Sequence, residues 1–422
     1  MIKKIINQSK SKENKQLLSN FFSLSILQGA NYLLPLLTFP YLVRVIGVEY
    51  FGLLAFATAT VTYFQIITDY GFNLSATKEI SIHRDNKEKL IEIFSSVMTI
   101  KFLLMFISFF LLSIMIFVFE KFNKEALVYF FTFGTVIGQV LFPLWFFQGI
   151  EKMKYITYLN IISKAIFTIS IFIFIKEESD YYLVPILTSI GFILVGVYSL
   201  IILKKEFNIT FRFQSSITIK YYLTEGWHIF LSRIYVNLYT TTNLILLGLF
   251  TNNTIVGYYS IAEKIVFAIG GLFEPATQTL YPYLVRKSRE SIHQFKKMLI
   301  NIASIYLIIS FSLTFISEYF KEEIVHLITG EYNPEVISLL AIFLIRLVTY
   351  PFGGLFSNSL IIMNKKKDFL KVMNYTVLIN FLIIPVSIYF WSENGLIISF
   401  IFVHIIHVSL LFYFMQRKTN EL

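Results

Sequence analysis

Long apolar runs, each about the length of a membrane-spanning helix, follow one another along nearly the whole chain. A helix needs about 20 mostly apolar residues to cross a bilayer, so these runs predict twelve spanning helices. The predicted spans are residues 18–38, 50–72, 91–119, 126–149, 156–175, 182–203, 227–250, 256–284, 298–317, 335–363, 369–391 and 395–415. The connections are short, so we expect no inserted soluble domain. The first run exceeds a signal-peptide core of about 7–15 residues, and we expect it to remain as a span.

The composition predicts the same class of protein. Hydrophobic residues make up 56% of the chain and charged residues 15%, against about 25% in ordinary soluble domains. So few charges cannot cover a soluble surface, and we therefore expect an all-α integral membrane protein. Cysteine is absent, which excludes disulfides, thiol nucleophiles and cysteine-ligated metal sites.

The distribution of positive charge predicts the orientation of the spans. The net charge is +10, and Lys and Arg together number 36. With the N-terminus placed in the cytoplasm, 26 of them fall in inner segments, five in outer loops and five inside spans. Because cytoplasmic loops of membrane proteins are enriched in Lys and Arg, both termini are predicted to be cytoplasmic. The same rule explains the basic charge without a nucleic-acid partner.

Six spans in each half give the two halves the same orientation, so an internal repeat would be parallel. At an offset of 205 residues, Gly52 aligns with Gly257 and Asp69 with Glu274. We therefore predict two six-helix bundles, residues 1–203 and 227–422, joined by a cytoplasmic linker at 204–226.

Polar residues recur at helical spacing in spans 1, 2, 7 and 8, so each of these spans has one polar face. The residues are Gln28 and Asn31 in span 1, Thr58, Thr62, Gln65 and Asp69 in span 2, Arg233 and Asn237 in span 7, and Glu263, Glu274 and Gln278 in span 8. Such faces either line a wet cavity or pair with one another. Their matching positions in the two halves favour a cavity.

Five cations lie within the predicted spans. We expect Lys101 and Lys264 to reach water near the helix ends. Lys164, Arg233 and Arg346 are candidate ligands for an anionic substrate, because a guanidinium fork suits phosphate or carboxylate.

The three acids inside the spans, Asp69, Glu263 and Glu274, are candidates for coupling to H⁺ or Na⁺. Internal salt bridges to Arg233, Arg346 or Lys264 are the alternative.

Proline and glycine predict breaks in three spans, at Pro143, around Gly270 and Pro275, and at Pro351. His404 and His407 share one helical face, and we interpret them as buried residues rather than as metal ligands. No phosphate-binding GxxxxGK[ST] loop and no Asp-rich metal–diphosphate motif occurs. We therefore predict a protein that is not an enzyme and needs no cofactor or metal.

Several of these stretches carry a family likeness. The run QGANYLLPLLTFPYLVRVIG begins at Gln28, FPLWFFQGIEKMKYIT at Phe142, VGYYSIAEKI at Val256, YPYLVR at Tyr281 and YPFGGLFSNSL at Tyr350. Together they resemble Wzx-type flippases, which move repeat units of O-antigen or capsule. The likeness covers nearly the whole chain, but beyond Phe369 it consists of hydrophobicity alone.

The resemblance implies a MATE-like fold, with two six-helix bundles around a cavity lined mainly by spans 1, 2, 7 and 8. It implies that an undecaprenyl-diphosphate-linked oligosaccharide is turned from the inner to the outer leaflet of the bacterial cytoplasmic (inner) membrane by alternating access. The diphosphate would suit Arg233, and the glycan would suit the polar faces. Membrane lipid, the polysaccharide polymerase and the chain-length regulator are the implied partners.

Three alternatives stay open. An ion-coupled drug or small-molecule exporter of the same superfamily would have a more acidic cavity. A flippase for the peptidoglycan precursor usually has more than twelve spans. A membrane-bound polysaccharide polymerase or glycosyltransferase would need a catalytic carboxylate or arginine on a sizeable loop, and the longest outer loop is residues 318–334.

Overall fold

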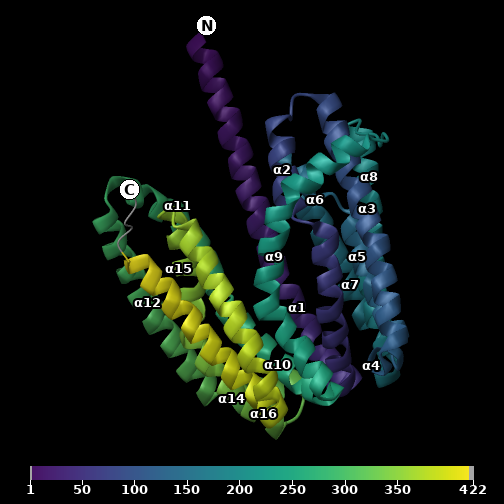
Figure 1. Cartoon of the computed structure of the whole chain (residues 1–422), viewed down its shortest axis with the longest axis vertical. Coiled ribbons are helices and arrows are strands. Elements are labelled where there is room, and N and C mark those ends of the chain that lie inside the picture. Colours follow the sequence, from purple (N-terminus) through teal and green to yellow (C-terminus); the bar gives the residue numbers. More distant parts are fainter. Residues whose placement is uncertain (1, 418–422) are drawn as a thin grey trace. The chain divides into compact units, whose positions relative to one another are not determined.

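The computed structural model describes the backbone of residues 2–417 and the side chains of residues 29–31, 34–281 and 283–417. All regular secondary structure in this part is helical (Figure 1). The chain divides into two compact units, Met1–Ile46 with Ala57–Ile234, and Gly47–Phe56 with Tyr235–Leu422. The predicted bundles at 1–203 and 227–422, with a linker at 204–226, stay a prediction.

Two long helices contribute residues to both units: α1 (Ile2–Asp69) and α9 (Ser216–Phe250). The other helices of the first unit are α2 (Phe72–Ile82), α3 (Lys87–Val118), α4 (Glu120–Asn123), α5 (Ala126–Leu141), α6 (Leu144–Gly149), α7 (Met153–Phe174), the 3₁₀ helix η1 (Glu178–Tyr182) and α8 (Leu183–Glu206). Those of the second unit are α10 (Asn253–Gly270), α11 (Phe273–Glu290), α12 (Ile292–Tyr319), α13 (Lys321–Thr329), α14 (Pro334–Leu344), the 3₁₀ helix η2 (Ile345–Val348), α15 (Tyr350–Ile362) and α16 (Lys366–Gln416).

Side-chain caps mark several of the helix starts. Asn86 accepts a hydrogen bond from the Lys89 N–H at the start of α3, and Asn252 accepts one from the Ile255 N–H at the start of α10. These oxygens satisfy N–H groups that have no partner inside the helix. The local sequence thus explains where these helices begin.

Helix α1 is broken at Gly47, which has φ 74° and ψ 169°. Glycine adopts this conformation readily, whereas a residue with a Cβ is strained in it. Residues 39–46, between the predicted spans 18–38 and 50–72, are therefore helical up to this one break. Val43 and Ile46, at 2% and 0% exposure, keep that stretch packed.

Helix α16 folds back on itself at Ser392, where φ is 52° and ψ is −134°. Ser399 donates a hydrogen bond to Ser387 across the break (2.6 Å), and Lys365 donates one to the Phe414 carbonyl oxygen (2.9 Å). Partners 12 and 49 residues apart in sequence cannot meet in one straight helix. The two halves of α16 therefore form an antiparallel hairpin, as the predicted spans 369–391 and 395–415 require.

The three breaks predicted from proline and glycine are confirmed. Helices α5 and α6 are separated at Phe142 and Pro143. Helices α10 and α11 meet at a bend of 41° after Gly270. Between α14 and α15 the chain passes through η2, and Pro351 lies in the first turn of α15.

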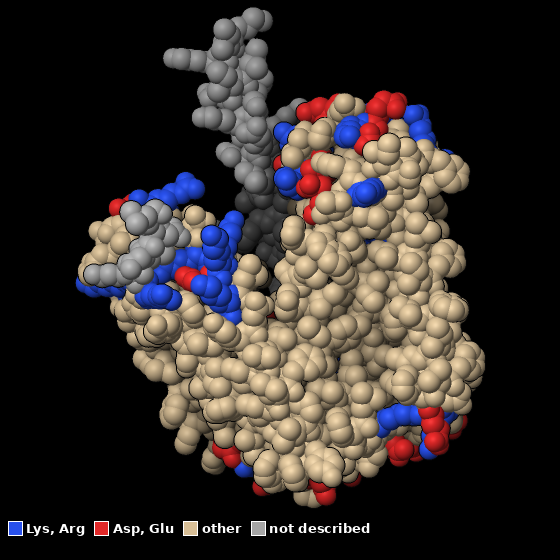
Figure 2. All heavy atoms as spheres, in the orientation of Figure 1, with Lys and Arg blue, Asp and Glu red and all other residues tan. Residues whose placement is uncertain are grey.

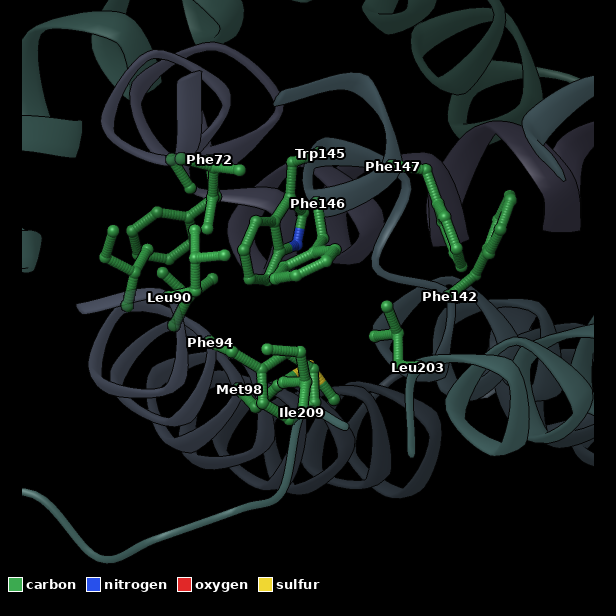
Figure 3. Close-up of a cluster of buried hydrophobic side chains, with 14 of the residues drawn as sticks. Phe72, Leu90, Phe94, Met98, Phe142, Trp145, Phe146, Phe147, Leu203 and Ile209 are labelled. Carbon is green, nitrogen blue, oxygen red and sulfur yellow. The ribbon is translucent and has the colours of Figure 1, made fainter. Parts of the chain in front are cut away.

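An aromatic cluster forms part of the core of the first unit (Figure 3). Trp145 and Phe146 of α6 are fully buried, and they pack against Phe94 of α3 with ring centroids 6.3 and 6.2 Å away. Ile209, in the segment after α8, is buried in the same cluster at 3% exposure. The short helix α6 is therefore anchored by large apolar side chains.

Eight helices in the described part are long and apolar enough to cross a membrane, or nine if the bent pair of α10 and α11 counts as one span. On the first unit, charged side chains gather towards the helix ends, and the stretch between them is almost free of charge (Figure 2). Among the charges at these ends are the ion pairs of Arg84 with Glu151 and of Lys124 with Glu120. This pattern is typical of a multi-pass membrane protein.

Candidate functional site

In the first unit, two predicted site residues meet. The Lys164 Nζ of α7 donates a hydrogen bond to the Asn31 Oδ1 of α1 at 2.6 Å. Both side chains are half-buried, and Lys164 lines a small cavity of about 190 Å³ with Pro35, Thr38 and Phe167. The two residues lie 133 positions apart, so the sequence pattern could not predict this pairing.

The polar face predicted for span 2 lies on α1. Gln65 donates from Nε2 to the Thr135 hydroxyl oxygen of α5 at 3.0 Å, and Thr62 bonds to the Thr58 carbonyl oxygen at 2.8 Å. Gln65 therefore joins two helices of the first unit. Thr58, one turn before Thr62, is exposed.

Asp69 is the last residue of α1, and it is 8% exposed. Its Oδ1 has no hydrogen-bond partner in the described part of the chain. The positive charges of Lys101 on α3 and Arg233 on α9 act on this carboxylate. Arg233 itself is exposed. The structure thus brings two predicted site residues, Asp69 and Arg233, into one electrostatic group.

The third member of this group, Lys101, corrects an expectation. Lys101 is 1% exposed, so it does not reach water. Its Nζ donates to the Gln139 carbonyl oxygen of α5 at 3.4 Å. Gln139 lies four residues before Pro143, which has no N–H to donate to that oxygen. The lysine therefore supplies the donor that the break removes.

In the second unit, Arg346 of η2 is buried at 5% exposure. It lines a cavity of about 380 Å³ together with Glu274 of α11, which is an exposed residue. These are two of the predicted site residues, separated by 72 positions in the sequence. The structure therefore brings a candidate anion ligand and a candidate ion-coupling residue to one cavity.

Of the remaining predicted residues, Glu263 is the one on which the charge of Arg346 acts. Glu263 of α10 accepts a hydrogen bond from the Tyr259 hydroxyl at 3.1 Å, and no ion pair within 4.0 Å is found for it among the described residues. Lys264 is exposed on α10. Asn237 accepts a bond from Thr241 on the same helix at 3.1 Å. The side chain of Gln28 lies outside the described residues.

Two buried polar pairs escaped the sequence reasoning. Asn380 of α16 donates to the Asn243 Oδ1 of α9 at 2.9 Å, and both side chains are 0% exposed. The His407 Nδ1 lies 2.9 Å from the Thr376 hydroxyl, across the hairpin of α16. For the first pair, the sequence did offer a signal, namely an asparagine within each of the two apolar runs. His404 and His407, at 8% and 3% exposure, are buried as predicted.

The two clusters differ in chemistry. The first unit offers an exposed guanidinium beside a buried carboxylate, and a lysine bound to an amide oxygen. The second unit offers a buried guanidinium at the wall of a cavity. Both suit the binding of an anionic molecule within a membrane protein.

Comparison with known proteins gives a family and two named relatives. Residues 17–288 match the family model described as "Polysaccharide biosynthesis protein". A protein of Escherichia coli (strain K12), named "Putative O-antigen transporter", is 37% identical over 263 residues, which are 62% of this chain and 63% of that relative. A Shigella dysenteriae protein of the same name is 28% identical over 401 residues, 92% of this chain and 97% of that relative. The first match thus spans less than two thirds of that relative's length.

Two solved structures share the fold. An inward-facing multidrug resistance MATE family transporter of the MOP superfamily superimposes with a TM-score of 0.69, at 14% identity, covering 91% of this chain and 94% of that one. The lipid II flippase MurJ, in an inward closed conformation, gives 0.68 at 14% identity, covering 95% and 87%. The predicted MATE-like, all-α fold is thereby confirmed.

Proposed function

Because the chain belongs to the polysaccharide biosynthesis protein family, we propose that it is a Wzx-type flippase. It carries undecaprenyl-diphosphate-linked oligosaccharide repeat units, of O-antigen or capsule, from the inner to the outer leaflet of a bacterial cytoplasmic membrane by alternating access. The observation that carries the proposal is the match to relatives named as O-antigen transporters, one of them over 97% of its length. The fold shared with a lipid II flippase supports it.

Twelve spans with both termini in the cytoplasm are part of the proposal. At 1.5 Å per residue, α1 with 68 residues and α16 with 51 are ~100 and ~76 Å long, against about 30 Å of hydrocarbon. Each helix is broken once, at Gly47 or Ser392, and so supplies two spans. Counting α9 and the bent pair α10–α11 as one span each completes the twelve. The bias of Lys and Arg gives the orientation.

The lipid-linked diphosphate is the group that Arg233 suits best. Its guanidinium is exposed in the first unit and presents a planar fork of donors. Hydrogen bonds to charged groups contribute about 1.5–3 kcal/mol, so this one side chain can supply tenfold or more in affinity. Lys164 with Asn31, and Gln65, offer further polar contacts for the head group.

An ion-coupled exporter of drugs or small molecules is the second candidate. The similarity to the multidrug transporter, with a TM-score of 0.69, favours it on the fold alone. Both candidates can use H⁺ or Na⁺ coupling, for which Asp69, Glu263 and Glu274 remain the predicted residues. The polysaccharide polymerase and the chain-length regulator remain proposed partners.

A leaflet assay in a strain lacking this gene tests the proposal. Spheroplasts are treated with an impermeant glycan label, and lipid-linked oligosaccharides are then extracted and scored by leaflet. We expect single repeat units to accumulate on the inner leaflet, and surface polysaccharide to be lost. Normal outer-leaflet labelling, in a strain with no second flippase gene, would favour the exporter instead.

Complementation with variants tests the role of Arg233. We expect Arg233→Gln to lower the rate of translocation at least tenfold. Arg212→Gln is the matched control, because Arg212 is exposed after α8 and pairs with Glu88 at 3.0 Å. It should restore translocation fully. Unchanged transport by Arg233→Gln would refute the diphosphate contact and leave the flippase proposal standing.

A further inference from the structure

The cavity of about 380 Å³ in the second unit is built from six helical segments. Tyr239 of α9, Phe267 of α10, Glu274 of α11, Tyr350 of α15 and His404 of α16 line it together with Arg346 of η2. Ligand pockets in proteins measure about 300–1,000 Å³. This cavity is at the lower end of that range and suits a ligand of about one sugar ring.

Arg346 is the unusual residue of the cavity. Its guanidinium carbon lies 4.4 Å from the ring centroid of Phe400, 4.8 Å from that of Phe267 and 5.4 Å from that of Tyr350. Its Nε and Nη1 have no hydrogen-bond partner, and no carboxylate of the described residues lies within 4.0 Å of it.

A buried arginine of this kind calls for an anion. Arginine stays charged, and Glu263 acts on it without forming an ion pair within 4.0 Å among the described residues, so two buried donors are left unpaired. Contact with aromatic faces stabilises the positive charge, but it satisfies none of the N–H donors. A carboxylate or phosphate in the cavity would accept from the guanidinium and complete the site.

The other walls resemble a site for a hydroxylated ring. Gln278, Ser357 and Asn358 bring amide and hydroxyl groups to the cavity, and Tyr239 and Phe273 bring aromatic faces. An apolar pocket with a few convergent polar groups is the usual setting for a small ligand. Amides and hydroxyls can both donate to and accept from sugar hydroxyl groups.

Glu274 distinguishes between possible anions. It lines the cavity together with Arg346, and the half-buried Glu263 of α10 also acts on the guanidinium, so negative charge is already present around this site. A ligand with a single negative charge adds the least repulsion to it. A diphosphate carries more negative charge and would be repelled by Glu274.

We propose that this cavity binds a sugar residue bearing one carboxylate, with the carboxylate on Arg346 and the ring between the aromatic faces. The inference rests on the proposed function, since the sugar belongs to the translocated glycan. The cavity beside Lys164 in the first unit is a weaker candidate. It is half the size, and its lysine already donates to Asn31.

Binding of simple glycosides to the full-length protein in lipid nanodiscs tests the proposal. The probes are methyl β-D-glucuronoside and methyl β-D-glucoside, which differ in the carboxylate, and affinities are measured by saturation-transfer NMR titration. We expect the wild type to bind the glucuronoside at least tenfold more tightly than the glucoside. Equal affinities, or no binding of the glucuronoside, would overturn the inference.

Two variants assign the carboxylate contact. Arg346→Gln should weaken glucuronoside binding at least tenfold and leave glucoside binding unchanged. Its matched control is Lys371→Gln on α16, where the lysine is exposed and lies 3.9 Å from Asp368. If Arg346→Gln does not fold, Glu274→Gln at an exposed position serves instead. It should tighten glucuronoside binding severalfold without affecting the glucoside, and an unchanged affinity would count against the proposal.

Inorganic pyrophosphate tests whether the anion bound in the cavity is a diphosphate or the carboxylate of a sugar. Displacement of the glucuronoside by pyrophosphate from the wild type, with no pyrophosphate binding to Arg346→Gln, would make the cavity a diphosphate site and refute the sugar proposal. The leaflet assay keeps the two proposals apart. Translocation without glucuronoside binding defeats this inference alone, whereas lack of translocation defeats the proposed function.

Discussion

A lysine at 1% exposure inside the first unit shows how a single residue can be held in a membrane protein. Lys101 supplies a donor to the Gln139 carbonyl oxygen, which Pro143 leaves without one. The negative charge of Asp69 acts favourably on the ammonium group. The lysine is therefore a structural residue rather than a substrate ligand.

We predict that Lys101→Met destabilises the protein by roughly 1–3 kcal/mol, because it leaves the Gln139 carbonyl oxygen without this donor and removes one of the two positive charges that act on the buried Asp69 carboxylate. Adding Asp69→Asn should recover part of the loss. The coupling energy of the pair should be about 0.5–3 kcal/mol. Thermal unfolding in one detergent measures the change in stability of each single variant and of the double variant.

Lys124→Met is the control for this cycle, since the Lys124 side chain is 74% exposed and its pair with Glu120 is a surface contact. It should change stability by less than about 1 kcal/mol. Strictly additive effects of Lys101→Met and Asp69→Asn would contradict the electrostatic link between the two.

At the scale of elements, two helices of the second unit approach closely through glycine. A Cβ on Gly257 of α10 would lie 2.2 Å from the Val48 carbonyl oxygen of α1, and one on Gly52 would lie 2.5 Å from the Gly257 nitrogen. Small residues allow membrane helices to pack backbone against backbone. The two glycines, aligned at the offset of 205, are therefore neighbours in space.

We predict that Gly257→Ala lowers the stability of the protein by about 1–3 kcal/mol. The added methyl group would clash with backbone atoms of α1, which cannot shift independently of their helix. Alanine favours a helix over glycine by about 1 kcal/mol, so the loss must come from packing. Gly354→Ala on α15 is the matched control, with nothing within 4 Å of the added Cβ. It should be neutral or stabilising in the same unfolding assay, and equal behaviour of the two variants would disprove the close contact.

At the scale of the whole molecule, the breaks in the long helices determine on which side of the membrane the chain ends. A hairpin at Ser392 returns the chain to the side from which α16 starts. A fluorescent protein fused after the last residue should therefore fluoresce in the cytoplasm. Alkaline phosphatase fused at Glu331, in the predicted outer loop, should be active.

These fusions are scored in intact cells. If the fluorescent protein at the C-terminus is dark and alkaline phosphatase fused at the C-terminus is active, the C-terminus lies outside. That result would rule out twelve spans with both termini in the cytoplasm. Fusion at Arg212, in the predicted inner linker, is the control for an inner position and should give no phosphatase activity.

Much of the fold could be predicted from local signals. Apolar runs marked the helices, and Pro143, Gly270 and Pro351 marked breaks that the structure contains. Residues 39–46, between two predicted spans, are helical up to Gly47, because buried apolar residues such as Val43 and Ile46 pack there. The family likeness came from the same stretches, and the family match confirms it.

The candidate site was harder to predict. Arg346 was singled out as a cation within an apolar run, yet its aromatic surroundings come from Phe267, Tyr350 and Phe400 on three helices. The expectation for Lys101 failed because its partner lies on another helix, at a carbonyl freed by a proline. The position of Arg346 or Lys101 within its own span could not indicate these contacts with other helices.

Local sequence patterns were sufficient to predict the class of protein, the order of its helices and most of their breaks. These follow from hydropathy and backbone geometry, which act over a few neighbouring residues. Which polar groups pair depends on how the helices pack, as with Gln65 and Thr135, 70 positions apart, or Asn243 and Asn380, 137 apart. A buried polar group needs a partner, and in a helical membrane protein that partner lies on another helix wherever packing brings the two together.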